Sequence, residues 1–219
     1  MNAEFWIERW NQHQIGFHQK EINSYLTSMW SQTNLPIDSG ILVPLCGKSL
    51  DMLWLADQKY RVVGIELSEV AASEFCAENS FLTTPQSIEG GYLWKFNSAI
   101  SFICKDFFKV TAADTGKING VYDRAALVAL PPEMRKTYAS HVTSLLEKGG
   151  KIFLVTFEYS QDKMKGPPFS VTKDEVSQLY GHDFIIDEIT KVELKDQSRL
   201  AALPENEKIL ERVYILEKK

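Results

Sequence analysis

The stretch that most constrains this chain runs from residue 40 to residue 66 and reads GILVPLCGKSLDMLWLADQKYRVVGIE. Residues 41–43 are apolar and partly β-branched, as a buried parallel strand requires. A turn around Gly47 follows, then a helical segment, then a second apolar strand over residues 61–65. This order predicts a βαβ unit, and therefore an α/β fold with parallel strands.

Glu66 ends the second of these strands, about twenty residues after the glycine turn, which is where a nucleotide-binding βαβ unit places a carboxylate on ribose hydroxyls. Glycine in the turn lets backbone amides approach a ligand. The unit therefore indicates a nucleoside-type ligand at the strand ends. A plainer interpretation stays open here, because any parallel α/β protein contains this order and an acid after a strand is often only solvated.

Two phosphate-binding motifs can be set aside in the same stretch. CGKS resembles the end of a P-loop, but that motif needs a glycine five residues before its Gly-Lys pair, where this chain has Leu42. A dinucleotide fingerprint needs three spaced glycines, and only Gly47 is present. The pattern favours a nucleoside without phosphate, of which S-adenosylmethionine is the commonest, and predicts that Lys48 lies at the surface.

Length and composition narrow the class of protein. The chain has 219 residues, 44% of them apolar, which suits one domain over residues 1–219. Its net charge is −5 and it has no basic block, so we expect no nucleic-acid partner. It also has no apolar run of membrane-span length, and we expect no leader.

The three cysteines are odd in number, lie in or beside apolar runs and match no zinc spacing. They predict buried free thiols, no metal site and a reducing, cytoplasmic compartment. No exposed apolar seam stands out, so we expect a monomer.

Residues 1–35 precede the first core strand and are expected to form an N-terminal helical cover. Trp6 and Trp10 lie four positions apart on a short helix and so share a face. Gly16 breaks the pattern, and a second helical rhythm covers residues 21–30. A helix docked on the sheet and a lid over a ligand both fit, and they are compatible because one face can pack while the loop covers a ligand.

The remainder of the chain alternates strands and helices. Ser68 and Thr172 are expected to cap helices. The proline pair at residues 131–132 is expected to start another, running to about residue 146, and Gly149 and Gly150 are expected to end it. Residues 84–91 are expected to form a polar loop. Strands are expected at residues 92–96, 100–104, 119–123, 151–157, 183–192 and 212–217, the last two paired as an antiparallel edge.

The count of about seven strands with helices between them predicts a Rossmann-like class I methyltransferase fold. We expect a seven-stranded, mostly parallel sheet with helices on both faces.

Polar and aromatic side chains follow several of these strands. Asp106 follows residues 100–104, where an acid often faces an adenine amino group; a helix or turn cap is the alternative. Asp123 and Arg124 end the next strand on its ligand side. Phe169 follows two stiff prolines in the loop of residues 161–170, which we interpret as an active-site cover rather than a plain connection.

Several longer blocks resemble the bacterial branch of the thiopurine S-methyltransferase family, nearly from end to end. These blocks are FWIERW with QIGFH, VPLCGKSLDMLWLAD, VVGIELSE, YDRAALVAL, KGPPFSV and ERVYIL. The resemblance implies an S-adenosylmethionine-dependent methyltransferase that methylates the sulfur of aromatic or heterocyclic thiols and releases S-adenosylhomocysteine.

The resemblance also implies roles for individual residues. Trp6 and Trp10 would cover the cofactor, the Leu45 backbone would meet its methionine part, and Glu66 would hold its ribose. An acceptor-facing arginine is expected late in the chain, with Arg199 as the nearest candidate. The other implied roles are adenine contact by Asp106 and Phe107, cofactor and acceptor contact by Arg124, and acceptor contact by Phe17 and Phe169.

The chain contains no His–Asp or Cys–His pair to act as a base, so we expect positioning to carry the reaction, with no catalytic residue. Aromatic heterocyclic thiols ionise near neutral pH, and the thiolate is the nucleophile. His13, His18, His141 and His182 are expected at caps or at the surface.

Two other functions stay open. One is a methyltransferase for small thiols or for selenium and tellurium oxyanions. The other is a module that binds S-adenosylmethionine without turnover, against which the retained acceptor-side residues count.

Overall fold

The computed structural model describes residues 3–194 and 208–219. The chain divides into two compact units, Met1–Gly120 and Val121–Lys219. The organisation as one domain with a cover segment over residues 1–35 stays a prediction.

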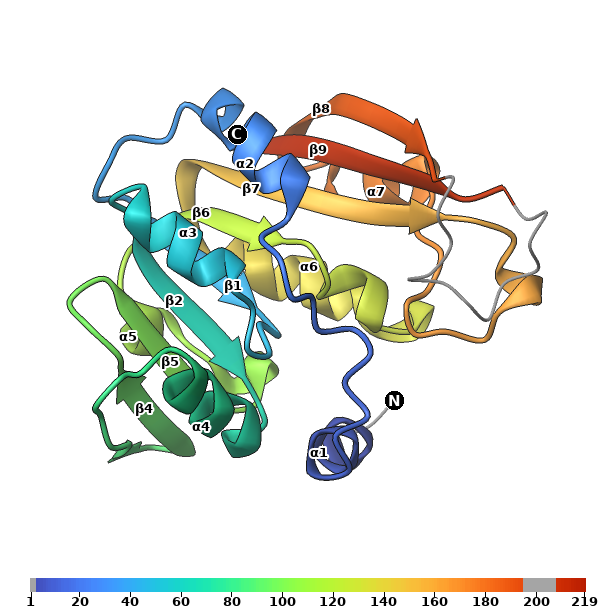
Figure 1. Cartoon of the computed structure of the whole chain (residues 1–219). Helices are drawn as coiled ribbons and strands as arrows, with labels where there is room; N and C mark the ends of the chain where they lie inside the picture. The colour runs from blue at the N-terminus through green and yellow to red at the C-terminus, as the bar shows by residue number, and fades with distance from the viewer. Residues whose placement is uncertain (1–2, 195–207) are drawn as a thin grey trace. The chain divides into compact units, whose positions relative to one another are not determined.

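The first unit is built on a mixed sheet with the strand order β3-β4-β5-β2-β1 (Figure 1). β1, β2 and β5 run parallel, whereas β4 pairs antiparallel with both β3 and β5. β1 is buried along its whole length, as a strand covered on both faces requires. The strands are β1 (Gly40–Pro44), β2 (Arg61–Glu66), β3 (Gln86–Ile88), β4 (Gly91–Lys95) and β5 (Ile100–Cys104).

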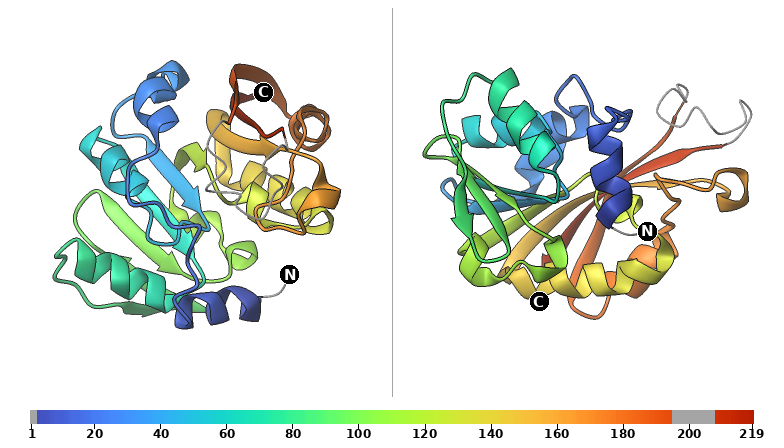
Figure 2. Two further views of the ribbon diagram at one scale, coloured as in Figure 1. Left: turned by 45° about the vertical axis from the view of Figure 1, so that its right-hand side comes forward. Right: turned by 90° about the horizontal axis from the view of Figure 1, so that it is seen from below.

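Helices surround this sheet, with α3 and α4 on one face and α5 on the other (Figures 1 and 2). Ser68 caps α4 by accepting the amide of Ala71, as expected. The leading segment is tied to α3, because the Asn23 amide donates to Asp51 over 2.8 Å. The helices are α1 (Ala3–Asn11), α2 (Ser24–Met29), η1 (Trp30–Thr33), α3 (Asp51–Asp57), α4 (Glu69–Glu78), η2 (Phe107–Lys109) and α5 (Ala112–Thr115).

β6 (Ile118–Asp123) carries the chain from the first unit into the second, where the strand order is β7-β9-β8. β9 pairs antiparallel with both neighbours, which confirms the predicted antiparallel edge. α6 and α7 contact each other and cover one face of these strands (Figure 2). The elements are η3 (Leu127–Ala129), α6 (Pro132–Leu145), β7 (Leu146–Glu158), η4 (Gln161–Lys163), α7 (Lys173–Tyr180), β8 (Phe184–Glu193) and β9 (Leu210–Lys218).

The strand count differs from the prediction, since the described residues form nine strands rather than seven. The set is mixed rather than mostly parallel, because β3, β4, β7, β8 and β9 all pair antiparallel. β3 lies inside the predicted polar loop of residues 84–91; its first two residues are exposed, so it carries no hydrophobic alternation.

Gly149 and Gly150 do not end α6, which stops at Leu145. They lie inside β7, where Gly149 takes a positive φ of 72°.

All three cysteines are buried and free, as predicted. None of the described helices has the length and hydropathy that a membrane crossing needs.

Candidate active site

The candidate site is built first from the strand ends of the first unit. β1, β2 and β5 are parallel neighbours, so the residues that follow them meet at one edge of the sheet. Leu45 directly follows β1, Glu66 is the last residue of β2, and Asp106 is the second residue after β5. The pairing continues past β5, because the Lys105 amide donates to the Glu66 carbonyl over 3.0 Å.

The turn after β1 has an unusual backbone. Leu45 has a φ of 47° and Gly47 a φ of 52°, and a bulky non-glycine residue in this region is uncommon. The Cys46 amide donates to the Ile65 carbonyl over 2.9 Å, which holds the turn against the end of β2. Two left-handed residues so close together fold the backbone back on itself directly beside Glu66.

Glu66 is held by three backbone amides. Its Oε2 accepts the amide of Gly47 over 3.0 Å, and its Oε1 accepts those of Leu67 over 2.8 Å and Ser68 over 3.0 Å. The side chain is only 7% exposed. Burial raises the pKa of the carboxyl group, and the three amides act in the opposite direction. The carboxylate therefore has one fixed orientation beside the glycine turn.

Trp10 lies directly on that turn. A Cβ placed on Gly47 would come within 3.1 Å of the Trp10 Cζ2, so a side chain larger than hydrogen would meet the indole. Trp10 is 1% exposed, and its ring centroid lies 5.7 Å from that of Phe17. Trp6 also lies 5.7 Å from Phe17, which is itself 39% exposed. The predicted shared face of the two tryptophans is confirmed, and together with Phe17 we call them the indole cluster.

Asp106 and Phe107 lie at the neighbouring strand end. The Asp106 Oδ1 accepts the Phe108 amide over 3.1 Å and caps η2, which matches the alternative considered for it. Phe107 is 2% exposed. The adenine contact implied for these two residues stays a proposal.

Lys48 is not a surface residue, so this prediction is wrong. Its side chain is 7% exposed, and its Nζ lies 2.8 Å from Glu74 Oε2 and 2.6 Å from Glu78 Oε1. Glu74 Oε1 also lies 3.3 Å from His13 Nδ1. Burial alone would lower the Lys48 pKa, but the two carboxylates raise it above its ordinary value.

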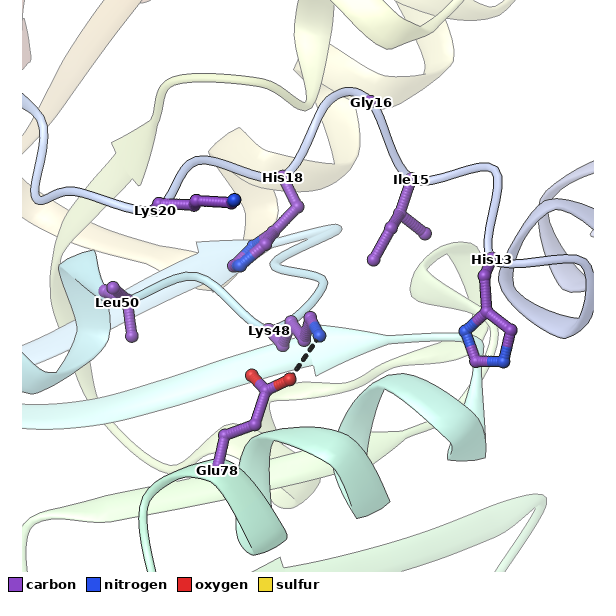
Figure 3. A pocket seen from close by; sticks show the side chains of 8 residues that line it. All are labelled: His13, Ile15, Gly16, His18, Lys20, Lys48, Leu50 and Glu78. Carbon is purple, nitrogen blue, oxygen red and sulfur yellow. Dashed lines mark hydrogen bonds and ion pairs between the residues drawn. The ribbon is translucent and has the colours of Figure 1, made fainter.

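Lys48 and Glu78 also line a pocket of about 610 Å³ beneath the segment that leads from α1 to α2 (Figure 3). The other lining residues are His13, Ile15, Gly16, His18, Lys20 and Leu50.

In the second unit, Asp123 fixes the loop that carries Arg124. The Asp123 Oδ1 accepts the amides of Ala126 and Leu127, both over 3.1 Å, and its Oδ2 accepts the Tyr138 hydroxyl over 2.7 Å. Burial raises the pKa of Asp123 to about 6, against the effect of these hydrogen bonds. Arg124 itself is half-buried and has no hydrogen bond or ion pair with the described part of the chain.

Phe169 is packed within its own unit, at 9% exposure. Its amide donates to the Val128 carbonyl over 2.6 Å, and its ring lies 5.8 Å from the Arg135 guanidinium carbon. A Cβ on Gly166 would come within 2.5 Å of the ring, so Gly166 leaves room for it.

The structure thus brings Trp6, Trp10, Phe17, Leu45 and Glu66 together in the first unit. Arg124 and Phe169 lie in the second unit, and Arg199 lies outside the described residues. The ion pairs of Lys48 and the bond between Asp123 and Tyr138 were not predicted from the sequence. One signal was available, because Glu74 and Glu78 lie four apart and so share a face of α4.

The parallel strands, the carboxylate at the end of β2 and the glycine turn define a Rossmann-like class I methyltransferase. A solved structure with this fold is 1,6-didemethyltoxoflavin-N1-methyltransferase from Burkholderia thailandensis, with a TM-score of 0.66 and 14% identity over 99% of this chain and 87% of that one. The family model for thiopurine S-methyltransferase matches residues 1–219. The chain belongs to the thiopurine S-methyltransferase family.

Named relatives agree with the family model. The thiopurine S-methyltransferase of Pseudomonas fluorescens is 42% identical over 219 residues, which cover 100% of this chain and 98% of the relative. The one from Nitrosospira multiformis is 44% identical over 182 residues, or 83% of this chain and 82% of the relative. The resemblance seen in the sequence blocks is therefore confirmed.

Proposed function

We propose that this protein is an S-adenosylmethionine-dependent thiopurine S-methyltransferase, which methylates the sulfur of aromatic and heterocyclic thiols. Membership of the family supports the reaction class. The observation that carries the proposal for this chain is the Glu66 carboxylate, fixed by three amides beside the glycine turn and the indole cluster. When bound, the cofactor supplies an electrophilic methyl group on a positively charged sulfur.

The hydrogen bonds of Glu66 fit a ribose. An ionised carboxylate has about four acceptor positions, and the three amides use three of them. At least one position on Oε2 is left for a sugar hydroxyl. The amides also hold the carboxylate in one orientation before a ligand arrives, which lowers the entropy cost of binding.

The indole cluster fits a sulfonium. A tryptophan face attracts a desolvated cation by roughly 1–2 kcal/mol. Trp10, packed on Gly47, is the main candidate for this contact, and Trp6 supports it through Phe17. Leu45, Asp106 and Phe107 complete the proposed cofactor contacts with the methionine part and the adenine.

On the acceptor side we assign Phe17, Arg124 and Phe169. Phe17 is well exposed, so its ring is available to an aromatic acceptor. Arg124 keeps an uncompensated positive charge, which suits an anionic thiolate. The thiol would lose its proton to solvent before transfer, so the chain's task is to hold the thiolate in line with the methyl group rather than to remove a proton.

The proposal also covers the acceptor, the oligomeric state, the compartment and the absence of other partners. The acceptor is a small-molecule thiol or chalcogen, the protein acts as a monomer in the cytoplasm, and neither nucleic acid nor a membrane takes part.

A turnover assay with three acceptors tests the function. Purified protein and S-adenosylmethionine are incubated with a thiopurine, a small aliphatic thiol and selenite, and methylated products are measured. We expect the thiopurine to react fastest. Preference for selenite or the small thiol would favour the alternative acceptors, and cofactor binding without any product would favour a non-catalytic module.

Calorimetry on Glu66→Ala tests the ribose contact. The variant loses one or two charge-assisted hydrogen bonds, each worth about 1.5–3 kcal/mol, so S-adenosylhomocysteine should bind at least tenfold more weakly. Native affinity in the folded variant would refute the assignment.

A further inference from the structure

Lys48, Glu74, Glu78 and His13 form a side-chain cluster that the proposed chemistry does not use, and we call it the Lys48 cluster. Lys48 Nζ lies 2.8 Å from Glu74 and 2.6 Å from Glu78, and Glu74 lies 3.3 Å from His13 Nδ1. Figure 3 shows Lys48 reaching Glu78 across the floor of the pocket. The cluster joins three segments that are far apart in the sequence.

Each of these segments lies close in the sequence to a residue of the proposed cofactor site. Lys48 directly follows Gly47, whose amide bonds Glu66. Glu74 and Glu78 lie on α4, which begins at Glu69, three residues after Glu66. His13 follows α1, the helix that carries Trp10.

The burial of Lys48 shows that its position is tightly held. A lysine that is 7% exposed loses most of its hydration, and the two carboxylates replace it. Moving the glycine turn away from α4 would separate the Lys48 ammonium from the two carboxylates. Neither the turn nor the helix alone offers interactions that would offset the free energy this costs. The ion pairs therefore oppose any widening between the turn and α4.

We propose that Lys48 is a positioning residue of the cofactor site: its ion pairs to α4 hold the glycine turn where the Gly47 amide reaches Glu66 and where Trp10 packs on Gly47. The Glu74–His13 contact extends this hold to the segment that follows Trp10. The inference rests on the proposed function of Glu66 and Trp10. Lys48 itself touches no reacting group.

The test compares S-adenosylhomocysteine affinity and steady-state kinetics in Lys48→Met, Lys48→Arg and Lys20→Met. Lys20 lines the same pocket and is exposed, with no ion pair to the described residues, so Lys20→Met is the matched control. We expect Lys48→Met to weaken binding about tenfold and to raise the cofactor KM, with kcat at saturating cofactor within about twofold. Lys20→Met should match the wild type, and Lys48→Arg should recover most of the affinity.

Wild-type affinity in folded Lys48→Met, or an equal loss in Lys48→Arg, would overturn the inference. If Lys48→Met does not fold, the double variant Glu74→Gln, Glu78→Gln replaces it, because these side chains are 22% and 49% exposed. It should bind severalfold more weakly, and unchanged affinity would overturn the inference too. Failure of the wild type to bind would instead refute the proposed function.

Discussion

Two acids end strands in the two units, and they are held in different ways. Glu66, in the first unit, bonds only to backbone amides and keeps an acceptor position on Oε2. Asp123, in the second, has one oxygen on two amides and the other on the Tyr138 hydroxyl, at 1% exposure. The same sequence pattern, an acid after a buried strand, thus leaves an acceptor position for the proposed ligand in one unit and forms a loop anchor in the other.

The largest expected effect comes from removing the Asp123 side chain, which anchors the loop. Asp123→Ala leaves two amides and a buried phenol without their acceptor, each costing about 1–3 kcal/mol, so we expect the free energy of unfolding to fall by about 4 kcal/mol. Chemical denaturation of the variant and the wild type measures it. Wild-type stability in the variant would show that Asp123 does not anchor the loop.

The pH dependence of stability sharpens the same comparison. Burial raises the pKa of Asp123 from 3.8 to about 6, so the folded chain binds this proton more tightly than the unfolded chain does. The stabilisation that comes from this raised pKa is fully present below the pKa of the unfolded chain. It is lost as the pH rises through the pKa of the folded chain, and the free energy of unfolding falls by about 3 kcal/mol in all.

Asp123→Asn removes this titration. The stability of the wild type relative to the variant should therefore fall between about pH 4 and pH 6. Parallel stability curves across this range would contradict the assignment.

Tyr138→Phe is expected to lower the free energy of unfolding by a smaller amount, about 2 kcal/mol at neutral pH, because it removes one hydrogen bond to a charged group. That bond favours the carboxylate, so the loss should be greater at pH 7 than at pH 4. Denaturation at the two pH values measures the difference. An equal loss at both would mean that Asp123 does not change its charge in this range.

Trp10→Phe, in the first unit, should have the smallest effect, about 1 kcal/mol on the free energy of cofactor binding. Phenylalanine is a weaker partner for a cation than tryptophan. Binding of the sulfonium cofactor should therefore weaken severalfold, whereas binding of the uncharged thioether product should change less. Calorimetry with both ligands tests this, and an equal change for both would exclude a cation–π contribution.

Local patterns predicted much of the first unit. The segment from β1 to β2, the Ser68 cap and the shared face of Trp6 and Trp10 all depend on residues close together in the sequence. The Thr172 cap in the second unit is of the same kind. Hydrophobic period and capping residues are sufficient to find such features.

Long-range pairs could not be predicted in this way. Lys48 was expected at the surface because no local pattern reveals that α4 brings two acids to it. Tyr138 and Asp123 are 15 positions apart. Arg135 and Glu175, whose side chains form an ion pair at 2.7 Å, are 40 apart. β3 was missed because an exposed edge strand needs no apolar alternation.

The placement of β9 has a consequence for synthesis on the ribosome. β9 follows β7 and β8 in the chain but lies between them, pairing with both. Until it emerges from the exit tunnel, each of its neighbours presents an open backbone edge, and such edges invite pairing with other nascent chains. Chaperone capture should therefore be strongest in the interval between translation of β8 and release of β9.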